Sequence, residues 1–257
     1  MSGRGSTGVL VSELTKIRTV RSTTWTLLLT FLLSVAISLA LAVFMRGAFD
    51  RISPAERDSF DPAEFALGTV AYGQVVLVAF AVLVVSSEYG SGTIRASLAA
   101  VPLRGRFYGT KILAGGLLAF VVAELTAFAM FFVSQVALGE HGGSLGDPGV
   151  LRAVFGTGVY LTLIALFSTG VATVLRSSAL ALGVLIPFFF IVSNLLGHVP
   201  GIKRVGQFLP DQAGHQIMLV TTQTDSVLGP WTGLLVQAAW AAAALAGGYL
   251  ALRSRDA

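Results

Sequence analysis

The chain has 257 residues, of which 54% are hydrophobic and only 12% are charged. Soluble domains carry about 25% charged residues, so this composition excludes an ordinary soluble protein and favours an integral membrane protein. The chain has no cysteine, which excludes disulfide frameworks, thiolate metal sites and a cysteine nucleophile. The net charge of +4 is less informative than the distribution of the charges along the chain.

Residues 1–24 precede the first long apolar run and form the first predicted unit. A tail rich in Gly, Ser and Thr is followed by a predicted amphipathic helix over 9–21, in which Leu10, Leu14 and Ile17 share one face. Such a helix would lie in the cytoplasmic interface of the membrane, and a plain basic flank is the alternative. Residues 25–257 are predicted to form one transmembrane domain.

Six apolar runs follow, each long enough to cross roughly 30 Å of hydrocarbon as a helix that rises about 1.5 Å per residue. The first run is too long for the apolar core of a cleaved signal peptide. The pattern therefore predicts an all-α integral membrane protein with six transmembrane helices, at residues 25–44, 65–85, 112–138, 153–175, 179–196 and 228–252.

The distribution of charge predicts the orientation of these helices. Lys and Arg are more numerous in the segments on the same side as the N-terminus, and acidic residues are more numerous on the opposite side. Cytoplasmic loops of membrane proteins carry an excess of Lys and Arg. Both termini are therefore predicted to be cytoplasmic.

Residues 86–111 form a long predicted cytoplasmic connection between the second and third spans. Gly90 and Gly92 interrupt the second helix, and Ile94 and Leu98 then share one face of a short predicted helix. A short helix with an exposed apolar face suits docking into a groove of another protein. A helix that lies on the membrane surface without a partner is the alternative.

The run Glu88-Tyr89-Gly90-x-Gly92-Thr93-Ile94-Arg95, followed by a basic segment, resembles a region of bacterial ABC transporter permeases of the type-2 export family. The layout of spans and loops is similar to that family along nearly the whole chain. The resemblance implies a coupling helix here, in contact with a separate ATP-binding cassette subunit, and short re-entrant outer helices before the sixth span. In this sequence Gly90-Ser91 stand where many relatives have a basic or polar pair, which predicts a more flexible start of the coupling helix. The residues assigned to the coupling contact are Glu88, Tyr89, Gly90, Gly92, Thr93, Ile94 and Arg95, with Leu98 on the apolar face.

Three residues in the spans are candidates for a substrate path or gate. Glu124 lies within the third span, where a charge is costly unless it is paired or faces water. It is either a polar point or protonatable switch in the path, or a packing residue hydrogen-bonded to Gln74, Gln135 or Thr126. The other two candidates are Pro187, a hinge or a static kink in the fifth span, and Asn194 near the outer end of that span.

The outer segment before the sixth span also has helical signals. Asp211 is suited to cap a helix from about Gln212 to Val220. His141, His198 and His215 are predicted to lie in separate outer loops, which argues against a metal site.

The sequence has no P-loop of the form G-x-x-x-x-G-K-[ST], so ATP and Mg²⁺ are expected on a partner chain and no cofactor on this one. No catalytic residues are predicted. We therefore expect a permease subunit of an ATP-driven exporter in the bacterial cytoplasmic membrane, paired with a second copy of itself and in contact with lipid but not nucleic acid. Its cargo is expected to be an amphipathic or hydrophobic drug, antibiotic, peptide or lipid. The alternatives are a non-transporting scaffold, sensor or immunity partner of an ATPase, and a membrane-embedded lipid-modifying enzyme.

Overall fold

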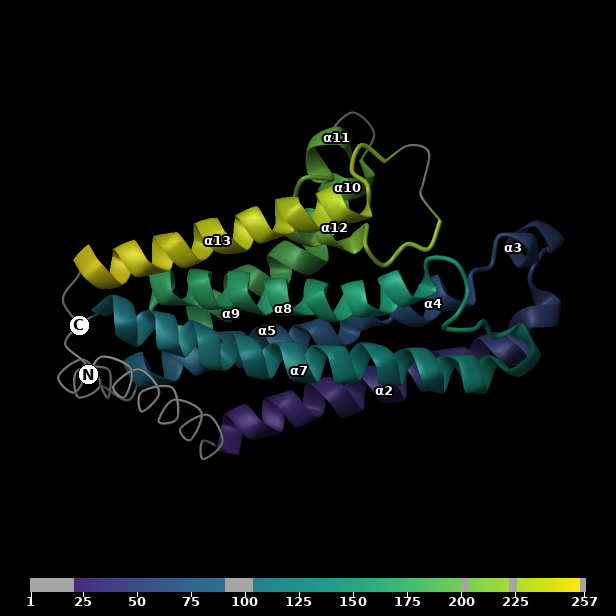
Figure 1. Cartoon of the computed structure of the whole chain (residues 1–257), viewed down its shortest axis with the longest axis horizontal. Helices are drawn as coiled ribbons and strands as arrows, with labels where there is room; N and C mark the ends of the chain where they lie inside the picture. Colours follow the sequence, from purple (N-terminus) through teal and green to yellow (C-terminus); the bar gives the residue numbers. More distant parts are fainter. Residues whose placement is uncertain (1–20, 91–103, 200–202, 222–225, 255–257) are drawn as a thin grey trace.

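A computed structural model describes residues 21–90, 104–199, 203–221 and 226–254, and this part of the chain is helical without any strand (Figure 1). The predicted interfacial helix over 9–21 falls almost entirely outside the described residues. The same is true of five residues assigned to the coupling contact, Gly92, Thr93, Ile94, Arg95 and Leu98.

The prediction of an all-helical protein with six membrane-length helices is confirmed. The six spans are Thr24–Arg51, Pro62–Ser87, Arg104–His141, Val150–Leu175, Ser178–Gly197 and Pro230–Ser254. Their main helices are α2 (Arg21–Ala48), α5 (Val70–Gly90), α7 (Arg104–Leu138), α8 (Val150–Leu175), α9 (Ser178–Pro187) and α13 (Pro230–Ser254).

Several of these helices extend beyond the predicted boundaries. α7 begins at Arg104 rather than at residue 112, and α2 continues to Ala48 rather than ending at residue 44. The predicted boundaries marked only the apolar core of each helix. Polar and basic residues on either side of the apolar core continue the same helical hydrogen bonding, so composition alone does not reveal where the helix ends.

α5 and α8 form the centre of the bundle. In their most apolar stretches 61% and 67% of the residues are buried, against 22–33% in the other four spans. α8 packs against α5, α7, α9 and α13 (Figure 1). Large, fully buried side chains from these helices form the core, among them Leu77, Phe80, Phe131, Leu161, Ile164 and Leu185.

Small and hydroxylated residues bring neighbouring helices close together. Gly170 of α8 lies directly against the backbone of α13 at Ala244, so a Cβ atom at position 170 would overlap that backbone. The Ser38 and Ser134 hydroxyls, 2.6 Å apart, join α2 to α7. Helix association in a bilayer depends on such close packing and interhelical hydrogen bonds, since lipid tails are as apolar as the side chains.

The fifth span changes helical type along its length. α9 ends at Pro187, a π-helical segment η3 (Phe188–Ser193) follows, and α10 (Asn194–His198) completes the span. Proline has no N–H to donate and its ring crowds the preceding turn, which disrupts the regular α-helical pattern. The local widening brings Ser193 to a fully buried position, where it faces α12.

The start of α2 and the end of α13 lie at one end of the bundle, which we call the terminal end (Figure 1). Away from it lie the short helices α3 (Pro54–Asp58) and α4 (Pro62–Gly68), and α11 (Lys203–Gly206) and α12 (Pro210–His215) lie beside the start of α13. We call the part of the bundle that carries these four short helices the distal end.

The helix expected from about Gln212 to Val220 is wrong in its start, its end and its cap. α12 begins at Pro210, has Leu209 at the N-cap without a side-chain hydrogen bond, and ends at His215. Proline is favoured in the first turn because its missing N–H has no helical partner there. The side chain of Asp211 is therefore available for a different contact.

Candidate functional site

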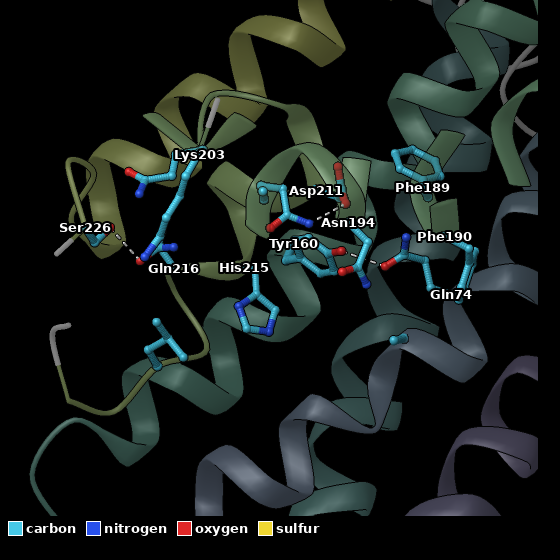
Figure 2. Close-up of a pocket in the computed structure, with 15 residues that line it drawn as sticks. Gln74, Tyr160, Phe189, Phe190, Asn194, Lys203, Asp211, His215, Gln216 and Ser226 are labelled. Carbon is cyan, nitrogen blue, oxygen red and sulfur yellow. Dashed lines mark hydrogen bonds between the residues drawn. The ribbon is translucent and has the colours of Figure 1, made fainter. Parts of the chain in front are cut away.

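A polar cavity of about 430 Å³ lies at the distal end, between α5, α8, the η3–α10 segment, α11 and α12 (Figure 2). Carboxamide side chains are the commonest polar groups on its wall, and the aromatic rings of Phe189 and Phe190 form an apolar part of it. The other lining residues are Ala71, Gln74, Tyr160, Asn194, Gly197, Lys203, Gln207, Asp211, Gln212, His215, Gln216, Leu219 and Ser226.

Tyr160 and Gln74 form a buried part of the wall, and each is only 4% exposed. The Tyr160 hydroxyl donates to Oε1 of Gln74 at 2.6 Å (Figure 2). Nε2 of Gln237 in α13 donates to the main-chain carbonyl of Tyr160 at 3.0 Å. These two bonds join α5, α8 and α13, and the wall residues Gln74 and Tyr160 belong to the two central helices of the bundle.

Asp211 forms a second buried part of the wall and is 7% exposed. Ser193 donates to its Oδ1, and Nε2 of Gln212 donates to its Oδ2 at 3.1 Å. Burial raises the pKa of the Asp211 carboxyl above its ordinary value, and the hydrogen bonds from Ser193 and Gln212 oppose that shift only in part. None of the basic side chains that the structure describes forms an ion pair with Asp211.

Two charged side chains hold the segment 217–221, which follows α12 and borders the cavity. The Arg152 guanidinium of α8 donates to three carbonyls of this segment at 2.9–3.2 Å. The Glu64 carboxylate of α4 accepts from the N–H groups of Val220 and Thr221 at 2.6 and 3.1 Å. One cation and one anion thus satisfy the backbone of an irregular segment that has no helix or strand to do so.

Arg152→Met should loosen this segment. The substitution keeps most of the side-chain volume and removes the three donated hydrogen bonds, which we expect to lower the free energy of local opening by about 2–4 kcal/mol. Amide hydrogen exchange of the purified protein should become at least about tenfold faster within 217–221. Arg51→Met removes an exposed cation at the same end and serves as the control. Unchanged exchange in Arg152→Met would show that Glu64 alone holds the segment.

Glu124 lies apart from this cavity. Its carboxyl group packs against Gly158 of α8, where a Cβ atom would overlap it. Both carboxyl oxygens are buried, and neither has a hydrogen-bond partner in the described part of the chain. The three partners considered for it bond elsewhere, since Gln74 accepts from Tyr160, Gln135 bonds Pro62 and Gly143, and Thr126 bonds Val122.

The three residues proposed for a substrate path do not form one site. Asn194 lines the polar cavity, whereas Pro187 and Glu124 do not. Pro187 is exposed at the end of α9, and Glu124 lies on the α7 side of α8.

The histidines are likewise dispersed. His141 stacks on Phe49 with ring centroids 3.7 Å apart, and His215 lines the cavity. Within the described ranges, no three His, Asp or Glu side chains come close enough together to hold a metal ion.

Basic side chains at the terminal end cap the C-termini of helices. The guanidinium of Arg104 donates to the Leu252 carbonyl at 2.8 Å, and that of Arg176 donates to the Ala251 carbonyl at 3.0 Å. Cations are favoured at helix C-termini, where carbonyls lack intrahelical partners. Lys111, which is 4% exposed, donates instead to a carbonyl inside α5, that of Val84, at 3.4 Å. Part of the basic excess that predicted the orientation therefore also stabilises the bundle.

The residues assigned to the coupling contact begin at this same end. Glu88, Tyr89 and Gly90 are the last residues of α5, and α7 starts at Arg104 beside the end of α13. Figure 1 shows the end of α5 and the start of α7 at the terminal end. The described residues on either side of this connection thus lie at the end where α2 begins and α13 finishes.

Comparison with known proteins leaves the family open. No protein-family model matches this chain, and no curated protein matches it. The functional interpretation therefore depends on the six spans, the sequence of the α5–α7 connection and the side-chain contacts described above.

Proposed function

We propose that this chain is the membrane-spanning permease subunit of an ATP-driven exporter of the ABC type-2 class in the bacterial cytoplasmic membrane. A separate ATP-binding subunit would supply ATP hydrolysis, and a second copy of the chain would complete the pathway. The observation that carries the proposal is the run Glu88–Arg95, placed between the second and third of six membrane-length helices.

The position of this run suits the transmission of movement. α5 is a continuous helix from Val70 to Gly90 and has a buried core, with Leu77 and Phe80 almost inaccessible. Near its other end it carries Gln74, a wall residue of the polar cavity. A push on the coupling residues when the ATP-binding subunits close would act on one end of α5, and a rigid helix would shift the other end with it.

The surface near Glu124 supports an amphipathic cargo. Leu117, Val121 and Leu125 are each about half exposed and follow one another at spacings of four along α7, so they form an apolar stripe. The Glu124 carboxyl belongs to the same helix, and both of its oxygens are buried against Gly158 without a hydrogen-bond partner among the described residues. We propose that an amphipathic substrate uses the stripe for its apolar part, and that its polar part reaches the acidic group when α7 and α8 move apart during transport.

Co-purification tests the coupling contact. The tagged chain is expressed with the ATP-binding protein encoded beside it, and wild type is expected to retain that protein through affinity purification. The double substitution Ile94→Asp and Leu98→Asp places two charges on the predicted apolar face and should abolish retention. As a matched control, Val205→Asp and Val227→Asp charge two exposed valines at the distal end and should leave retention unchanged.

Two results would count against the proposal. If wild type retains no ATP-binding protein, the permease assignment fails. If the Ile94 and Leu98 variant retains as much as wild type, the contact lies elsewhere on the chain. A second experiment distinguishes a permease from a scaffold or sensor that binds an ATPase without transport. Inactivation of ATP hydrolysis in the partner should stop export only if the chain is a permease.

A further inference from the structure

Among the described residues, no basic side chain forms an ion pair with Asp211, the acidic residue on the wall of the polar cavity. Asp211 is 7% exposed, and the groups that hydrogen-bond its carboxylate are neutral: the side chains of Ser193 and Gln212 and the main-chain N–H groups of Asp211 and Gln212. A buried carboxylate without a cation is unfavourable unless it becomes protonated or a ligand supplies the positive charge. A carboxylate held in place on the wall of a cavity is therefore suited to recognise a cation.

We propose that this cavity binds a small organic ligand through a primary ammonium group, with Asp211 as the charge partner. The site stands whether or not the chain is a permease, because it depends only on contacts within the distal end. Asp211 would select for the positive charge of the ligand, and the other wall residues would select for the size and shape of the ligand.

The remaining wall residues suit such a ligand. A cavity of about 430 Å³ lies within the range of about 300–1,000 Å³ that small-molecule sites occupy. The rings of Phe189 and Phe190 offer apolar contact for the ligand body and a face for a cation. The side-chain oxygen of a carboxamide accepts hydrogen bonds, so Gln212, whose Nε2 donates to Asp211, can accept an ammonium proton with its Oε1.

Lys203 is the main feature that would favour an anion instead. Its side chain lines the same cavity but is exposed, whereas Asp211 is buried. Water and salt screen an exposed charge much more strongly than a buried one. Asp211 therefore dominates the field that a ligand inside the cavity experiences, and Lys203 acts at the rim.

Paired fluorescent probes test the proposal on the full chain in lipid nanodiscs. Dansylcadaverine carries a primary ammonium group on a flexible chain, and the analogue with a hydroxyl in place of the amine is its neutral match. Saturable binding is measured by fluorescence after subtraction of empty nanodiscs. Wild type is expected to bind the amine at least about tenfold more tightly than the hydroxyl analogue.

Asp211→Asn is the decisive variant. It keeps an oxygen that can accept from Ser193, removes the charge, and should reduce the preference for the amine to about one. Unchanged binding of the hydroxyl analogue would show that the variant retains the cavity. Asp58→Asn removes one exposed acidic charge at the same end and should keep the wild-type preference.

The pH dependence supplies a second measurement. Because the pKa of Asp211 is raised, lowering the pH from neutral toward 3.8 should weaken amine binding to wild type early in that range, and the Asp211→Asn profile should be flat. Tyr160, Lys203 and His215 line the same cavity and are unchanged in Asp211→Asn. Any pH dependence that comes from these three residues would therefore remain in the variant, and a flat profile assigns the wild-type effect to Asp211. Equal affinity of wild type for the two probes, or an amine preference that survives in Asp211→Asn, would overturn the proposal.

Discussion

Gly170→Leu should prevent the bundle from folding stably. Position 170 of α8 faces the backbone of α13 at Ala244, and a backbone cannot turn away as a flexible side chain can. A leucine there would force the two helices apart along a closely packed contact of the central helix. We expect a loss of more than about 3 kcal/mol in the free energy of unfolding, seen as a large fall in the melting temperature or in the yield of monodisperse protein.

Gly183→Leu is the matched control for this effect. Gly183 lies in α9, is exposed, and has no atom within 4 Å of the position that a Cβ would occupy. Leucine is also a better helix former than glycine, so this variant should be at least as stable as wild type. If both leucine variants lost stability equally, general sensitivity of the spans would explain the result, and the α8–α13 contact would not.

Long apolar runs made the six spans predictable, because the length of hydrocarbon sets a length of apolar helix. The apolar run alone does not reveal the start of α7, because Arg104 and Arg106 are charged and yet belong to the helix. Nor could it show that Arg104 caps the end of α13, a contact between residues that lie far apart in the sequence.

The polar cavity was not predicted, although its residues carried a signal. Gln74 and Tyr160 are polar groups within apolar spans, and buried polar groups require partners. Which partners they find depends on how α5 and α8 pack, and a single sequence does not contain that information. Aspartate is favoured as a helix cap, so Asp211 predicts a helix that begins at about Gln212, but Pro210 begins the helix two residues earlier.

The sequence predicts that a charge on Glu124 is unfavourable within the third span, but it does not show which group would stabilise that charge. Three hydrogen-bonding residues were close enough along the spans to be considered, and the structure engages all three with other groups. The Glu124 carboxyl group therefore packs against Gly158, which has no side chain to bond it. A group that lowers stability and is nevertheless present is a candidate for a functional role.

Glu124→Met is therefore expected to stabilise the isolated chain. Methionine has a similar length and flexibility, fits beside Gly158 and removes two buried oxygens that lack partners. We expect the free energy of unfolding to rise by about 1–3 kcal/mol, measured as a higher melting temperature of the purified chain in one detergent. If the carboxyl group contacts the cargo, the same variant in the assembled transporter should lose export.

Gln135→Met in the same helix should have the opposite effect on stability. Gln135 donates to the Pro62 carbonyl at 3.1 Å and accepts from the Gly143 N–H at 2.7 Å, so methionine there would break two hydrogen bonds. The pair of variants makes the same kind of replacement in one helix and differs in whether the polar group has partners. If Glu124→Met lowered stability as much as Gln135→Met, Glu124 would have a partner outside the described chain, such as lipid, water or a second copy. Higher stability combined with lost export would instead assign Glu124 to the transport path.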